Sequence, residues 1–255
     1  MRPVRVASAN YYLQSDEAQP AKARQAIQWL IGSSSSTVYL AVIQNSIVDH
    51  IFRDVLGKDF VRNLIKRGSA LLDGHEVVLV THTRMQYNPV PSRLLAFYPD
   101  EAFLDELDAI PRITAMLVVP YQAEEIETWR KARNAVPLGQ PQQARVTMHL
   151  SDRVVEAAVR SLAQAVNQAN RLASGRDRER AVLTFRILLE EGHLSYDPED
   201  VKVFLMSECG FDGPLADTVK EIAEQILQGR RLRADRSYFV PNIMDIWKED
   251  AQGSS

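Results

Sequence analysis

Only one cysteine, Cys209, occurs among the 255 residues of the chain. A single thiol cannot form an internal disulfide, and it excludes a cysteine-rich zinc site. The 30 basic and 33 acidic side chains nearly cancel, which leaves a net charge of −3, so no global basic field favours nucleic acid or an acidic membrane. No apolar run approaches the roughly 18 residues of a membrane helix, and no apolar core follows the basic start as in a secretory signal. We therefore expect a cytoplasmic protein that does not associate with membranes.

The common catalytic and nucleotide-binding motifs are absent as well. The sequence has no G-x-x-x-x-G-K-[ST] phosphate loop, no G-x-S-x-G turn of a hydrolase and no H-E-x-x-H zinc motif. The first strongly apolar run ends in Gln44-Asn45 without a glycine, so the dinucleotide-binding fingerprint is missing too. We therefore expect neither a cofactor nor a metal, and the sequence favours a binding protein over an enzyme.

The N-terminal part, residues 1–135, alternates apolar β-branched runs with helical patterns. Strands are predicted at residues 37–43, 76–81, 94–97 and 115–119, and a helical stretch over 46–72 is predicted to break near Gly57. Strands separated by helices indicate a three-layer, Rossmann-like α/β domain with a mostly parallel or mixed sheet of about four strands. The link between the second and third strands is too short for a crossover helix. These two strands are therefore either antiparallel or separated by another strand.

The rest of the chain has a different organisation. Residues 136–147 contain two prolines, a glycine and three glutamines in V-P-L-G-Q-P-Q-Q, which is the composition of a linker. Residues 148–236 show four helical patterns joined by short loops, which predicts an all-α helical bundle.

Residues 237–255 form a tail that is unusually rich in apolar and aromatic side chains. Two interpretations are open: the tail folds back onto its own chain, or it docks into a protein partner or a second copy of the chain. In the second case aromatic anchors would carry the binding. The candidate anchors are Tyr238, Phe239, Ile243 and Trp247.

One candidate ligand site follows from the predicted sheet. Ligands of α/β sheets bind where loops converge beyond the carboxyl ends of the strands. Polar side chains follow the predicted strands at these ends, and Ser46 can begin the next helix, where an anion is favoured. An imidazole there could move protons near neutral pH, and a guanidinium could pair with a phosphate or carboxylate. The candidate ligand-binding residues are Asn45, Ser46, His82, Arg84, Tyr98 and Asp100.

Three functions remain open from these observations. The leading hypothesis is a non-catalytic cytoplasmic protein whose α/β domain holds a small anionic ligand or a protein partner, while the helical domain and tail mediate assembly or homo-oligomerisation. The first alternative is an enzyme acting on a nucleotide or phosphorylated metabolite, with Arg84 binding the anion and His82 or Asp100 as acid or base. The second alternative is a nucleic-acid accessory factor that uses two arginine clusters. These clusters are Arg171, Arg176, Arg178, Arg180 and Arg186, and Arg230, Arg231, Arg233 and Arg236.

Overall fold

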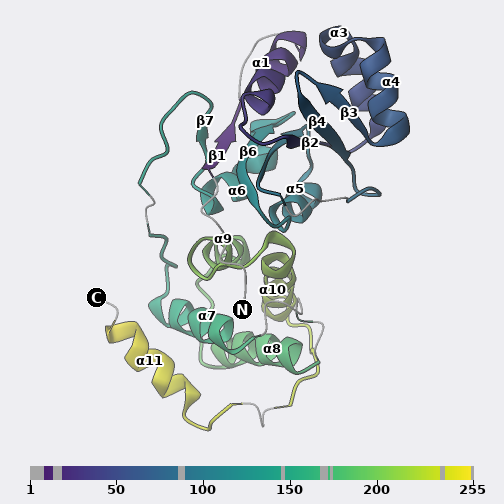
Figure 1. The fold of residues 1–255 in the computed structure, drawn as a ribbon. Helices are drawn as coiled ribbons and strands as arrows, with labels where there is room; N and C mark the ends of the chain where they lie inside the picture. Colours follow the sequence, from purple (N-terminus) through teal and green to yellow (C-terminus); the bar gives the residue numbers. More distant parts are fainter. Residues whose placement is uncertain are drawn as a thin grey trace. The chain divides into compact units, whose positions relative to one another are not determined.

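The structure, a computed structural model, describes residues 9–13, 19–85, 90–144, 147–166, 172, 175–235 and 239–253. The chain divides into two compact units, residues 1–144 and residues 145–255, which we call unit 1 and unit 2 (Figure 1). The predicted α/β class is confirmed, since unit 1 contains a mostly parallel sheet and unit 2 is built from helices.

Among the described residues the sheet of unit 1 has seven strands, so the prediction of about four strands counted too few. The strand order is β3-β4-β2-β5-β6-β1-β7, and β3 and β4 form the antiparallel pair beside otherwise parallel neighbours. The strands are β1 (Ala9–Tyr12), β2 (Thr37–Val42), β3 (Ser69–Leu72), β4 (His75–Val80), β5 (Ser92–Phe97), β6 (Ile113–Val119) and β7 (Val136–Pro137). The two residues of β7 belong to the segment that we predicted as a linker.

The short link after β4 is explained by the position of β2. Because β2 lies between β4 and β5, the chain passes from β4 to the strand beyond its neighbour. The alternative in which another strand separates the two is therefore confirmed, and the antiparallel alternative is wrong. Both β4 and β5 run parallel to β2, so their carboxyl ends reach the same edge of the sheet.

Helices cover both faces of the sheet (Figure 1). On one face, α1 (Gln19–Ile31) and the helices that follow β2 pack over Val38, Leu40 and Val42. On the other face, α5 (Glu101–Asp108) and α6 (Glu127–Ala132), the latter preceded by the 3-10 turn η2 (Ala123–Ile126), pack over Tyr39 and Ala41. All six residues of β2 are buried, as expected for a central strand with an apolar core on each side.

The helical region after β2 begins with a continuous arm. It consists of α2 (Asn45–Ile47), the π-helical segment η1 (Val48–Phe52) and α3 (Arg53–Leu56). The arm ends at Gly57, whose φ of 85° and ψ of 152° favour glycine strongly. The next helix, α4 (Lys58–Arg67), starts immediately after it. The predicted break near Gly57 is confirmed.

Unit 2 contains five helices among the described residues: α7 (Arg153–Ala165), α8 (Gly175–Glu190), α9 (Pro198–Glu208), α10 (Gly213–Leu227) and α11 (Ile243–Gly253). Aspartates begin three of them, because the side chains of Asp152, Asp197 and Asp212 accept hydrogen bonds from backbone N–H groups of the first turn. No helix of the described residues is long and apolar enough to cross a membrane.

The tail forms α11, which packs on α7 of the same unit (Figure 1). Trp247 is fully buried, Met244 is nearly so, and the Phe239 ring meets the Trp247 ring edge-on with centroids 5.8 Å apart. Ile243 is half-buried, and Tyr238 lies outside the described residues. Trp247 is therefore a core side chain of unit 2 in this conformation and offers no surface to a partner.

A candidate anion-binding groove

The six predicted ligand-binding residues do not form one site in the structure. Asn45 and Ser46 line a groove beside α4, while His82 and Asp100 lie next to each other at the start of α5. Arg84 points to the end of α4, and Tyr98 packs against other aromatic rings. The six residues thus lie in four separate arrangements.

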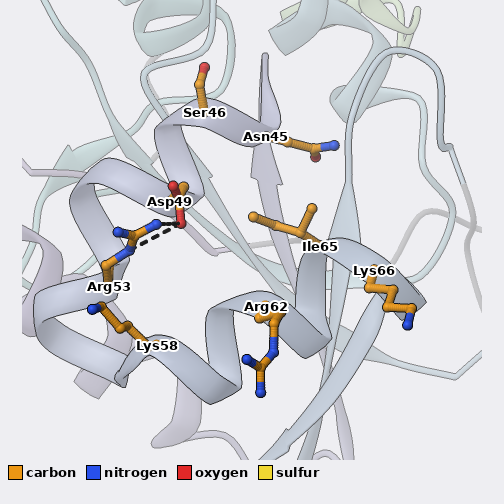
Figure 2. Close-up of a pocket in the computed structure, with 8 residues that line it drawn as sticks. All are labelled: Asn45, Ser46, Asp49, Arg53, Lys58, Arg62, Ile65 and Lys66. Atoms are coloured by element: carbon orange, nitrogen blue, oxygen red, sulfur yellow. Dashed lines mark hydrogen bonds and ion pairs between the residues drawn. The ribbon is translucent and has the colours of Figure 1, made fainter.

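The groove lies between the arm formed by α2, η1 and α3 and the helix α4, and its volume is about 570 Å³ (Figure 2). Asn45 and Ser46 come from the first turn after β2, so the end of this strand positions them. Asn45 and Ser46 are polar and uncharged, Ile65 contributes apolar surface, and the remaining five lining residues are charged. The full lining is Asn45, Ser46, Asp49, Arg53, Lys58, Arg62, Ile65 and Lys66.

The cations of the groove come mainly from one helix. Lys58, Arg62 and Lys66 are four residues apart on α4, and this spacing keeps them along one side of a helix. Their hydrophobic neighbours Val61 and Leu64 are buried against the sheet. The sequence contained this signal, a basic residue at every fourth position, but the same spacing is common on solvated helix faces.

Two of the four cations of the groove have acidic partners. Nε of Arg53 donates to Oδ1 of Asp49 at 3.1 Å, and Nη2 of Arg53 donates to the same oxygen. This hydrogen-bonded guanidinium holds the pKa of Asp49 below its ordinary value, and Asp49 in turn raises the pKa of Arg53. Nη2 of Arg62 lies 2.8 Å from Oδ1 of Asp59, with both side chains exposed to solvent.

The two lysines of the groove, Lys58 and Lys66, form no ion pair with any described residue. Both are exposed, so their ammonium groups are held in place by no acidic neighbour. Within the lining, four cations therefore face a single carboxylate, that of Asp49. This excess of positive charge gives the groove a preference for anions.

The second arrangement places a histidine between two carboxylates. Nδ1 of His82 lies 3.1 Å from Oε2 of Glu106, and Nε2 lies 3.9 Å from Oδ1 of Asp100. The His82 ring also packs on Phe103, with centroids 4.4 Å apart. Asp100 is already engaged, because its Oδ1 accepts the backbone N–H of Phe103 at 2.8 Å and so begins α5. These contacts explain the arrangement as a capped helix start with a histidine packed over it.

In the third arrangement, Arg84 lies away from the other predicted ligand-binding residues. Backbone hydrogen bonds in both directions join Thr81 and Arg84, and they turn the chain sharply after β4. The Arg84 side chain then extends over the end of α4, with Nη1 3.5 Å from the carbonyl oxygen of Ile65 and close to Gly68. Carbonyl groups at a helix C-terminus attract cations. Arg84 therefore stabilises the end of α4 and does not accompany His82.

The contacts of Tyr98 are also those of a residue with a structural role. Its backbone adopts a φ of 53°, and its ring contacts the rings of Phe97 and Tyr121 at centroid distances of 4.5 and 5.5 Å. Burial raises the pKa of Tyr98 above its ordinary value, so the phenol stays neutral near pH 7.

The arginine clusters of unit 2 are partly used within the unit. Nη1 of Arg180 donates to the carbonyl oxygen of Ala165 at 2.7 Å, and Arg186 donates to the carbonyl oxygen of Leu232. Arg171 and Arg236 lie outside the described residues. Two members of the predicted clusters therefore connect segments of unit 2, which leaves fewer guanidinium donors for the phosphates of a nucleic acid.

A second groove, of about 690 Å³, lies between α7 and α11 in unit 2. Its charged lining comprises Arg153, Arg160, Glu156, Glu249 and Asp250. Glu156 is buried and accepts from Arg160 at 3.0 Å and from Arg153 at 3.2 Å. Because the basic side chains are matched by carboxylates, this groove has no comparable preference for anions.

Comparison with known proteins concerns the C-terminal part of the chain. The model of a family described as a domain of unknown function (DUF1889) matches residues 151–248. The matched range contains α7 to α10 and the part of α11 that carries Trp247. No curated protein and no solved structure matches the chain. The similarity thus concerns unit 2, and the groove beside α4 is outside the matched range.

Proposed function

We propose that unit 1 binds a small anionic ligand in the groove between α2 and α4, and that the protein acts through this binding and not through catalysis. The observation that carries the proposal is the charge of the lining, four cations against one carboxylate. The unpaired ammonium groups of Lys58 and Lys66 would gain an anionic partner without losing an existing one.

Physical chemistry supports an anion at this place. Cations closer to one another than about 8 Å still repel at physiological ionic strength, because this distance is the Debye length there. A bound anion relieves this repulsion and forms charge-assisted hydrogen bonds with the lysines. The amide of Asn45 supplies a neutral donor on the opposite wall, whereas the Ser46 hydroxyl points away from α4 and donates to Oε1 of Gln44 at 3.4 Å (Figure 2). A groove of about 570 Å³ is within the usual range for small-molecule sites.

The enzyme alternative has less support. It required Arg84 to hold an anion beside His82 or Asp100, and Arg84 instead extends toward the end of α4. Neither His82 nor Asp100 lines the groove. The proposal therefore contains no catalytic step.

The assembly part of the leading hypothesis is not carried into the proposal. Phe239 and Trp247 pack on each other inside unit 2, and a partner could use them only after α11 had left α7. The nucleic-acid alternative is not carried further either, because Arg180 and Arg186 bind backbone carbonyl groups of their own unit.

A panel of anions tests the proposal on the full-length protein. Phosphate, sulfate, citrate and tripolyphosphate are titrated by isothermal calorimetry in wild type, in K58Q/K66Q and in the control R24Q. Arg24 is an exposed cation of α1 without a described ion pair, and it does not line the groove. We expect at least one anion to bind wild type and R24Q equally, and K58Q/K66Q at least tenfold more weakly. Failure of all anions to bind wild type, or equal binding to all three proteins, would refute the proposal.

A further inference from the structure

The arrangement of the cations along α4 says more about the anion than their number does. Lys58, Arg62 and Lys66 are separated by four residues each, so their Cα atoms rise by about 6 Å from one to the next. The three cations therefore extend over about 12 Å of helix. Figure 2 shows their charged ends at three separate points along the helix, not gathered around one centre.

This geometry differs from a site for a single phosphate group. Such a site directs several donors at one small anion, with each nitrogen about 2.7–2.9 Å from an oxygen. In the observed conformation Lys58, Arg62 and Lys66 do not converge on one point (Figure 2), and each can meet a different phosphate of a chain. We infer that the ligand of the groove is an oligophosphate, a chain of linked phosphates that lies along α4. The inference rests on the function proposed above.

The remaining walls of the groove agree with a ligand recognised by its phosphates. Arg53 on the opposite arm is paired with Asp49 and Arg62 is paired with Asp59, so Lys58 and Lys66 of α4 carry the unbalanced charge. Asn45 adds a neutral amide donor on the opposite arm. No aromatic side chain is among the eight residues of the lining, whereas binding of nucleobases commonly uses stacking on aromatic rings. Free oligophosphates and the phosphate tail of a nucleotide share this chemistry, and the two sources are distinguished by the test below.

The test measures how the affinity of the protein for its ligand depends on the number of linked phosphates. Phosphate, pyrophosphate, tripolyphosphate and ATP are titrated into the full-length protein by calorimetry, in buffer without divalent cations. We expect affinity to rise with each added phosphate, by at least about tenfold from phosphate to tripolyphosphate. We expect ATP and tripolyphosphate to bind within about threefold of each other, because the groove offers no stacking surface. Affinity for tripolyphosphate should also fall more steeply with added salt than affinity for phosphate.

Single variants test where the oligophosphate lies along α4. K66Q removes the last of the three cations on α4. It should therefore weaken the binding of tripolyphosphate by about tenfold and change the binding of phosphate much less. R24Q again serves as the control. Because Lys66 and Arg24 are both exposed, the two variants should fold equally well, which their thermal unfolding verifies.

The possible failures are distinct. If phosphate binds as tightly as tripolyphosphate, the groove binds an anion but the oligophosphate inference is wrong. Equal affinity for citrate and tripolyphosphate would show selection of charge alone and would overturn the inference too. An ATP affinity more than tenfold above that of tripolyphosphate would show recognition of the nucleoside, and much tighter binding of a single-stranded oligonucleotide would indicate a polymer instead. Absence of binding by every anion would refute the proposed function itself.

Discussion

Replacing Trp247 by alanine tests whether the tail belongs to the core of unit 2. The indole is fully buried between α11 and the rest of the unit, and it meets the Phe239 ring edge-on. Substitution of a buried tryptophan by alanine costs about 3–5 kcal/mol. The lost aromatic contact with Phe239 accounts for about 0.5–1.5 kcal/mol of this sum. We therefore expect W247A to destabilise the docked tail by about 3 kcal/mol or more.

The indole N–H makes a second substitution informative. Nε1 of Trp247 is buried and has no hydrogen-bond partner among the described residues. An unsatisfied buried donor costs about 1–3 kcal/mol, so part of the gain from burying the ring is already lost. Phenylalanine at this position would remove the donor together with some apolar area. We expect W247F to lie within about 1 kcal/mol of wild type.

The assay must distinguish release of α11 from unfolding of the whole unit. Urea unfolding followed by circular dichroism gives the total free energy, and hydrogen exchange of peptides from residues 239–253 and 153–165 reports the tail and α7 separately. In W247A, exchange should accelerate first in the tail, because α11 packs mainly on α7. I246A serves as the matched control, since Ile246 is on the same helix but 37% exposed.

One result would refute this reasoning. If W247A unfolds at the same urea concentration as wild type and its tail exchanges at the same rate, α11 does not dock on α7 in solution. The tail would then be available to a partner, and Phe239, Ile243 and Trp247 would again be candidate anchors for protein binding.

Three further predictions concern single residues. Burial raises the pKa of Cys209 to about 11, so the native thiol should react with a disulfide reagent at pH 7.5 far more slowly than in urea, and equal rates would contradict this. Burial opposes ionisation of Asp152, but the 2.7 Å contact with His193 and two backbone N–H groups lower its pKa overall. The stabilisation from ionised Asp152 is present above the unfolded pKa of about 4 and is lost as pH falls through the lower folded pKa. The melting temperature of D152N should therefore fall less steeply toward acid pH than that of wild type. G57A should cost about 1–3 kcal/mol through backbone strain, because Gly57 has a φ of 85° and no atom within 4 Å of the added Cβ; an unchanged unfolding midpoint would contradict it.

The parts of the fold that were predictable are those with apolar side chains on both faces. β2, β5 and β6 contain continuous buried runs, and β4 is buried from Val77 to Val80 except for the half-buried Val78. Such short β-branched runs are typical of central strands of a parallel sheet. The missed strands lack this signal. β3 follows α4 after one glycine, and its four residues, S-A-L-L, fit a continued helix as well as a strand. β1 carries the buried polar residue Asn10, and β7 is only two residues long.

Only the first two residues of the candidate site could be predicted from the sequence. Asn45 and Ser46 follow a central strand directly, so the general position of ligand sites in α/β sheets was enough to select them. Arg84 shows the limit of this argument. It is two residues from His82 in the sequence, but the turn between Thr81 and Arg84 sends the two side chains in different directions. Proximity in a loop therefore did not imply a shared site.

The sequence alone could not show that Arg53 and the cations of α4 line one groove. The placement of α3 relative to α4 decides this, and the conformation of Gly57 sets that placement. On one uninterrupted helix, Arg53 and Lys58 would be five residues apart and would point about 140° away from each other. The conformation of Gly57 ends α3 and starts α4 in a new direction, so both side chains line the same groove. Lys58, Arg62 and Lys66 then line one groove with Asn45 and Asp49 of the arm, and the charged ends of Arg62 and Lys66 point away from the arm (Figure 2). The groove is consequently a product of one backbone break, and ligand affinity should depend on that break as directly as on the cations themselves.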